Sequence, residues 1–198
     1  YDCLFYDQRG GGRTKHDDLA TITWHTQVVD LARVARELVA GPLHVVGYSW
    51  GALLALLHAL DATGVALPAV GAPLGDRPGH RAGGPAPASL ALIDPAPVSR
   101  AFRSEFEAEF ARRQGGEAVQ RLRAELAASG LRERDPAAYR QRAFELGVAG
   151  YFADPAASRD LTPFRVTGRV QQSIWESLGD FDLTRHLSGP IQCEGVIY

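Results

Sequence analysis

The chain has 198 residues, 21 Lys and Arg against 23 Asp and Glu, a formal net charge of −2 and 45% hydrophobic residues. This composition is that of an ordinary globular protein, and it excludes a strongly basic nucleic-acid-binding surface; no apolar run is long enough to span a bilayer. We therefore expect no nucleic-acid or membrane partner. The composition does not predict the oligomeric state.

An apolar segment, residues 1–7, predicts a buried strand that ends at Asp7, and a glycine-rich turn follows from Gln8 to Thr14. The turn lacks the Lys-Ser/Thr ending of a phosphate-binding loop, and no helix starts directly after it, so nucleotide binding is a weak alternative. The other interpretation is that the glycines let the backbone pack closely beneath a site. Asp7 and Arg9 favour a buried network that holds this turn.

Apolar residues at helical spacing predict a helix over about 24–39, capped by Thr21 or Thr23 and ended by Gly41-Pro42. A short apolar strand over 43–47 then leads into the sequence Gly47-Tyr48-Ser49-Trp50-Gly51, and an Ala/Leu-rich helix follows to about Leu60.

Strand, Gly-x-Ser-x-Gly and helix in this order are typical of a nucleophile elbow, in which a sharp turn exposes the serine hydroxyl at the end of the strand. The predicted nucleophile is Ser49. We expect Gly47 and Gly51 to be small because strand and helix approach closely there. The alternative is an ordinary strand–helix turn in which Ser49 only caps the helix.

Residues 61–88, rich in Gly, Pro and Ala, predict a surface loop or insertion, and residues 89–95 predict a second buried strand that ends at Asp94-Pro95. From about residue 99 to 179 the pattern is helical. One helix is marked by Phe102, Phe106 and Phe110; a second is marked by Val119, Leu122 and Leu126; a third opens at Asp135-Pro136; and a fourth covers about 170–178. A last strand is expected over 191–198.

Apolar strands that alternate with helices predict an α/β fold, with a mostly parallel sheet and helices on both faces. We expect residues 1–97 to form the core, with the elbow at 47–51. Residues 98–182 are expected to form a helical lid, and residues 183–198 to return to the core.

The elbow, the Asp7-to-Thr14 turn (DQRGGGRT) and the helical insert after Asp94-Pro95 together resemble the α/β-hydrolase superfamily. The most similar subgroup is that of the proline iminopeptidases and related serine peptidases or esterases. The resemblance implies that Ser49 attacks a carbonyl carbon to form an acyl-enzyme and that the backbone N–H of Trp50 donates to the oxyanion. It implies a small-molecule or short-peptide substrate and no metal or organic cofactor.

The resemblance also implies that some catalytic groups lie outside this sequence. A second oxyanion donor would precede Tyr1, and the catalytic acid and histidine would follow Tyr198. The chain contains no Met and both of its ends lie in apolar segments, so we expect an internal fragment that is inactive and poorly folded by itself. We expect a cytoplasmic location. None of the six histidines is expected to act as the base.

Asp94 ends the strand after the elbow strand, where some α/β-hydrolases place the acid; the alternative is a carboxylate that caps local N–H groups. Relatives bind the substrate amine with lid carboxylates, and Pro163 stands where one such acid would precede Phe164, which leaves Glu145 and Glu176 as lid acids. The alternative for both is an exposed helix charge. Tyr48 and Trp175 are candidates for substrate contact, although an aromatic residue on a lid helix more often serves packing.

Other chemistry on the same fold also fits the sequence, such as hydrolysis of an epoxide, a lactone or a C–C bond, and so does a non-catalytic ligand-binding role.

Overall fold

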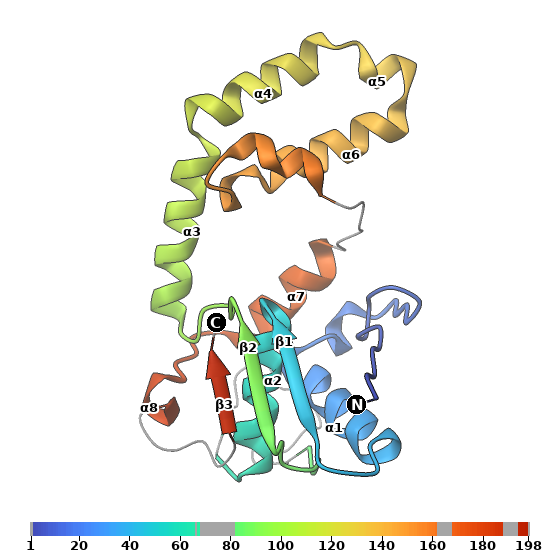
Figure 1. Ribbon diagram of the computed structural model, residues 1–198, viewed down its shortest axis with the longest axis vertical. Coiled ribbons are helices and arrows are strands. Elements are labelled where there is room, and N and C mark those ends of the chain that lie inside the picture. The colour runs from blue at the N-terminus through green and yellow to red at the C-terminus, as the bar shows by residue number, and fades with distance from the viewer. Residues whose placement is uncertain (1, 66, 68–81, 162–167, 188–193, 198) are drawn as a thin grey trace. The chain divides into compact units, whose positions relative to one another are not determined.

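A computed structural model describes residues 2–65, 67, 82–161, 168–187 and 194–197 (Figure 1). The chain divides into two compact units, each described by itself below. The first comprises Tyr1–Arg103 with Val166–Tyr198, and the second comprises Ser104–Arg165.

The first unit contains a three-stranded parallel sheet in the order β1-β2-β3. Its strands are β1 (His44–Tyr48), β2 (Ser89–Ile93) and β3 (Glu194–Ile197). In the register of the first pair, Tyr48 lies opposite Ile93, so these two strands end at the same level. Residues that follow them are therefore neighbours at one edge of the sheet.

Helix α2 (Trp50–Ala62) lies against one face of this sheet and is buried along nearly its whole length (Figure 1). Its two sides differ in the size of their side chains. Ala52, Ala55 and Ala59 pack with Leu90 and Leu92 of the sheet. The small residues let the helix axis approach the strands, while the leucines of α2 extend the other way into the main core.

That core is formed with α1 (Trp24–Leu38) and α7 (Gly168–Leu178). Thr23 caps α1 by accepting from the backbone N–H of Thr26, and the Thr26 side chain accepts from the N–H of Thr23 in return. The predicted helix and one of its two proposed caps are thus confirmed. The most buried side chains of the core include Ile22, Val28, Leu53, Leu57, Phe181 and Leu183.

Two short helices complete the first unit. They are η1 (Leu19–Thr21) and α8 (Thr184–Leu187). An isolated antiparallel bridge joins Ser99 to Asp182, and Leu183 donates a backbone hydrogen bond to Val98. These contacts tie the segment after α7 to the segment that follows β2.

The sheet corrects one prediction, because helices do not cover both of its faces in the described residues. His44, Val46 and Tyr48 alternate on the face of β1 away from α2, and all three are exposed, Val46 to 70%. The structure thus shows a small parallel sheet packed against helix on one side.

The predicted strand over residues 1–7 is wrong. Residues 2–7 are irregular, and Cys3, Leu4 and Phe5 are exposed, Phe5 to 93%. An apolar run forms a strand only where a neighbouring strand accepts its hydrogen bonds. Among the described residues, β1 pairs with β2 and offers no bonded partner to this segment.

The second unit is helical, as the sequence predicts. It holds most of α3 (Arg100–Gln114), then α4 (Glu117–Ala128), α5 (Leu131–Arg134), α6 (Pro136–Gly147), η2 (Ala149–Tyr151) and η3 (Pro155–Asp160). Asp135 caps α6 with Pro136 at its first turn, and its carboxylate accepts from the N–H groups of Ala137 and Ala138. None of the described helices is long and apolar enough to cross a membrane.

The phenylalanines that predict α3 do not form a closed core. Phe106 and Phe110 stack on one another and on Tyr151, with ring centroids 4.5 to 6.5 Å apart. Phe106 is nevertheless 45% exposed and Phe102 is 50% exposed. The fourfold spacing indicates one helix face, but it does not say what covers that face.

Candidate active site

Ser49 lies at the junction of β1 and α2 in a backbone conformation that few residues adopt. Its φ is 53° and its ψ is −118°. A positive φ is rare for a residue with a Cβ and persists only when the surrounding structure enforces it. Strand β1 and helix α2 enforce it here, and the predicted strand, turn and helix are all present.

Gly47 is the residue that permits the sharp turn. A Cβ on Gly47 would lie 2.3 Å from the carbonyl oxygen of Gly51 and 2.5 Å from the backbone nitrogen of Ala52. Gly51 differs, because a Cβ there would meet nothing within 4 Å. The expectation that both glycines are demanded by close packing is therefore correct for Gly47 and wrong for Gly51.

The backbone of Ser49 is fixed from both sides while its hydroxyl stays open. Its N–H donates to Ile93 O at 3.0 Å, and its carbonyl accepts from Ala96 N at 3.1 Å. The side chain makes no capping hydrogen bond to α2, and no described residue bonds to the hydroxyl. Ser49 is exposed at the start of the helix. The helix-capping alternative thus has no support in the geometry.

Helix α2 supplies an electrostatic setting that suits an oxyanion. The first N–H groups of a helix have no partner within it, and they carry partial positive charge. Trp50 is the first residue of α2, so its N–H directly follows Ser49. A negative oxygen bound beside Ser49 would be stabilised at this end.

Aromatic side chains adjoin the elbow within the first unit. The rings of Trp50 and Trp175 meet edge to face with centroids 5.9 Å apart, and Trp175 approaches Phe181 at 6.4 Å. The guanidinium of Arg103 lies 4.4 Å from the centroid of Trp175. Trp175 is half-buried, which fits both packing and contact with a ligand.

The glycine-rich turn is held by a polar network, as the sequence indicates, but through a different acid. Arg9 makes a bidentate ion pair with Asp30 of α1, at 2.7 and 2.8 Å, and Arg9 O accepts from the buried Gln27 side chain. Asp7 instead accepts from the backbone N–H of Arg13. Sequence reasoning missed Asp30, since nothing local marks a pair 21 positions apart.

The Asp30 carboxylate also affects the pKa of the Tyr6 hydroxyl. Burial, together with the negative charge of Asp30, raises the pKa of the Tyr6 hydroxyl to about 12. Tyr6 is therefore less acidic than an ordinary phenol.

Asp94 lies beside Ser49 at the edge of the sheet, since each follows one member of the Tyr48–Ile93 register pair. Asp94 also has a positive φ, of 42°; among the described residues other than glycine, it shares this with Ser49. Its side chain is exposed, and no described N–H group bonds to its carboxylate. The capping interpretation of Asp94 is therefore wrong within the described residues.

The described histidines are engaged elsewhere than at Ser49. His16 contacts Thr21, His25 packs against Trp24, and His44 bonds to Ser89 at 2.8 Å. His186 lies in α8, and His80 falls outside the described residues.

His58 is the buried member of this group. It is 0% exposed in α2, and its Nε2 donates to Pro85 O at 3.0 Å. Desolvation by burial lowers the pKa of its ring. A second hydrogen bond, from Ala82 N to the Asp61 carboxylate at 2.9 Å, also joins the described residues before β2 to α2. His58 is a packing residue of the core.

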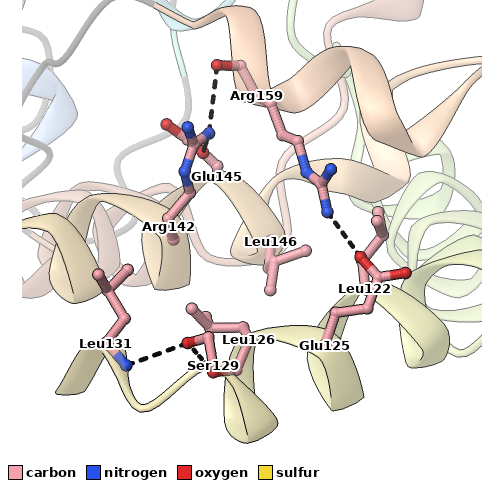
Figure 2. A pocket seen from close by; sticks show the side chains of 9 residues that line it. All are labelled: Leu122, Glu125, Leu126, Ser129, Leu131, Arg142, Glu145, Leu146 and Arg159. Carbon is pink, nitrogen blue, oxygen red and sulfur yellow. Dashed lines mark hydrogen bonds and ion pairs between the residues drawn. The ribbon is translucent and has the colours of Figure 1, made fainter.

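Glu145, a candidate for binding a substrate amine, lies in the second unit in a pocket of about 240 Å³ (Figure 2). It is 3% exposed, not the exposed helix charge of the alternative interpretation. Arg142 donates to it at 2.6 Å and Gln141 at 3.0 Å. Because a cation already neutralises this carboxylate, it is a poor receptor for a second one.

The remaining lining of the pocket is balanced in charge. Arg159 donates to Glu125 at 2.9 Å, a pair drawn in Figure 2, and four of the lining residues are leucines. Both carboxylates that line the pocket are thus paired with arginine. The pocket offers an apolar floor with no unbalanced charge.

The other predicted substrate contacts are scattered. Glu176 is exposed and accepts from Gln172 at 2.7 Å. Tyr48 lies on the open face of β1 and is 67% exposed. Pro163 and Phe164 lie outside the described residues. In the described residues there is no group of three or more His, Cys, Asp or Glu side chains that could hold a metal ion.

A strained, exposed serine between a parallel strand and a buried helix defines this chain as an α/β protein with a sharp strand–turn–helix junction. The sequence model of the alpha/beta hydrolase family matches residues 1–187. The chain therefore belongs to the alpha/beta hydrolase family, which supports a hydrolase. It matches no curated protein and no solved structure.

Proposed function

We propose that this protein is a serine hydrolase that cleaves an ester or amide through an acyl-enzyme on Ser49. The observation that carries the proposal is the exposed hydroxyl of Ser49 on a strained turn, unbonded to any described residue and next to the first N–H of α2. A serine that served only to cap the helix would bond to that N-terminus.

The proposed chemistry has two steps. The Ser49 oxygen attacks the carbonyl carbon, its proton passes to a base, and the oxyanion is stabilised by the N–H of Trp50. The leaving alcohol or amine departs with a proton, and water then hydrolyses the acyl-enzyme. The register of β1 and β2 supports a role for Asp94 in orienting a base at the same edge, beside Ser49.

Within the family, we assign the protein to the iminopeptidase-like hydrolases because of its Asp7-to-Thr14 turn. The Arg142 pair at Glu145 gives no support to an amine-binding role for that residue. We therefore assign the bond type broadly, to small-molecule esters or short peptides, and propose no metal or organic cofactor.

Burst kinetics test this proposal in the natural protein. A panel of p-nitrophenyl esters and prolyl anilides should give a product burst equal to the enzyme concentration for at least one substrate. Ser49→Ala should abolish the burst, whereas Ser129→Ala, at an exposed serine of the second unit, should leave it unchanged. Hydrolysis that survives Ser49→Ala would overturn the proposal.

A further inference from the structure

We propose that Gln8 is a positioning residue that fixes the oxyanion donor Trp50, an inference that rests on the proposed function. Gln8 lies 42 positions before Trp50 in the chain, and its Oε1 accepts from the indole Nε1–H of Trp50 at 3.1 Å. The glycine-rich turn thereby reaches the residue that follows the nucleophile.

Gln8 is itself rigidly placed. Its carbonyl accepts from Gly11 N at 2.8 Å, and Gly10 N donates to Thr14 O at 2.8 Å, which closes the turn. Gly10 has a φ of 81°, and a Cβ there would lie 2.8 Å from Ile22 in the core. The turn is therefore held against the core by its glycines.

Arg9, the next residue, attaches the same turn to α1. Its guanidinium donates two hydrogen bonds to Asp30, and its carbonyl accepts from Gln27, which is 0% exposed. A bidentate ion pair fixes orientation as well as distance. The Gln8 side chain thus extends from a segment anchored on both sides.

The ring of Trp50 contacts two side chains that restrain it, those of Gln8 and Trp175. Gln8 accepts from its N–H, and Trp175 meets the ring at an interplanar angle of 67°. The backbone N–H that we assign to the oxyanion belongs to this same residue. Fixing the ring restrains the first turn of α2, where an ångström of displacement would weaken a bond to a transient oxyanion.

This role predicts a particular kinetic signature. An interaction that matters to the oxyanion is stronger in the transition state than in the ground state, so its loss lowers kcat and leaves KM unchanged. Gln8→Leu keeps much of the side chain's bulk and removes the acceptor. We expect kcat to fall about five- to tenfold, the effect of one neutral hydrogen bond.

Three further measurements separate positioning from general stability. A boronic acid inhibitor, which mimics the tetrahedral intermediate, should lose affinity for Gln8→Leu by the same factor as kcat. Gln8→Glu keeps an acceptor and should restore most of kcat. The matched control is Gln172→Leu, which removes an exposed glutamine side chain bonded to Glu176 and should change neither value.

A double-mutant cycle tests the bond directly. Trp50→Phe removes the donor, so Gln8→Leu should have no further effect on kcat in that background. The Trp50 indole ¹⁵N–¹H resonance should shift in Gln8→Leu and keep its position in Gln172→Leu, whether or not the protein is active.

The outcomes are distinct. Additive effects of Gln8→Leu and Trp50→Phe, a raised KM at constant kcat, or an unmoved indole resonance would each overturn the positioning role. Survival of hydrolysis in Ser49→Ala would overturn the proposed function instead, and the indole resonance would still report the Gln8–Trp50 bond.

Discussion

Gly47→Ala is the substitution that most sharply tests the geometry of the elbow. The new Cβ would lie 2.3 Å from Gly51 O, 2.4 Å from Gly51 C and 2.5 Å from Ala52 N. An ordinary contact is about 3.5 Å, so the strand and helix must separate by about 1 Å. The atoms in the way are backbone atoms of α2, and the burial of Ala52–Asp61 prevents this helix from moving aside freely.

The expected cost lies at the upper end of the range for overpacking, about 3 kcal/mol in the free energy of unfolding. For a chain of this length, that corresponds to a Tm lower by roughly 6–12 °C. Urea denaturation followed by circular dichroism measures the free energy, and calorimetry measures the Tm. The matched control is Gly51→Ala, four residues on, where the Cβ meets nothing within 4 Å.

Gly51 lies within α2, where alanine is the better helix former, so Gly51→Ala should be neutral or stabilise by up to about 1 kcal/mol. The same methyl group should therefore destabilise the protein at position 47 and not at position 51, because only the first site is crowded by the backbone of α2. Equal stability of Gly47→Ala and the wild type, or an equal loss in both variants, would refute the described approach of β1 to α2.

Three further predictions concern residues away from the elbow. Burial lowers the pKa of His58 below its ordinary value of 6.5, so the unfolded chain binds a proton that the folded chain does not. The free energy of unfolding should therefore fall as pH drops from 7 to 5, and His58→Gln should flatten this dependence in urea denaturation. Glu145→Ala leaves Arg142 unpaired, but because Arg142 is 46% exposed the cost should be about 1–3 kcal/mol, seen as faster hydrogen exchange in α6. Asp135→Ala removes the cap of α6 and should cost about 1 kcal/mol, with exchange of the first-turn amides as the readout.

The elements that the sequence predicts well are those with local signals. Thr23 and Asp135 mark helix starts because their side chains satisfy free N–H groups within three residues. The sequence signal for the elbow is likewise local, since Gly47, Ser49 and Trp50 lie within four consecutive positions. Patterns of this kind involve groups a few residues apart, so they can be recognised without knowledge of the tertiary contacts.

The features that escaped prediction depend on distant partners. Residues 1–7 have the composition of a strand, but a strand needs a neighbour, and the described structure supplies none there. The bond from Trp50 to Gln8 joins residues 42 positions apart, and the Arg9–Asp30 pair joins residues 21 apart. No local pattern encodes such pairs.

Glu145, a predicted substrate contact, shows the same limit. Its position on a polar helix suggests exposure, yet it is 3% exposed and accepts from Arg142 and Gln141. Gly51 shows the converse, because the motif suggests a steric need that the structure does not show.

Active-site labelling can show directly whether Ser49 is the nucleophile. The natural protein is treated with a fluorophosphonate probe and digested, and the modified peptide is identified by mass spectrometry. We expect a single adduct on Ser49 that disappears in Ser49→Ala and forms normally in Ser129→Ala. If the protein hydrolyses its substrate but is not labelled at Ser49, then Ser49 is not the nucleophile.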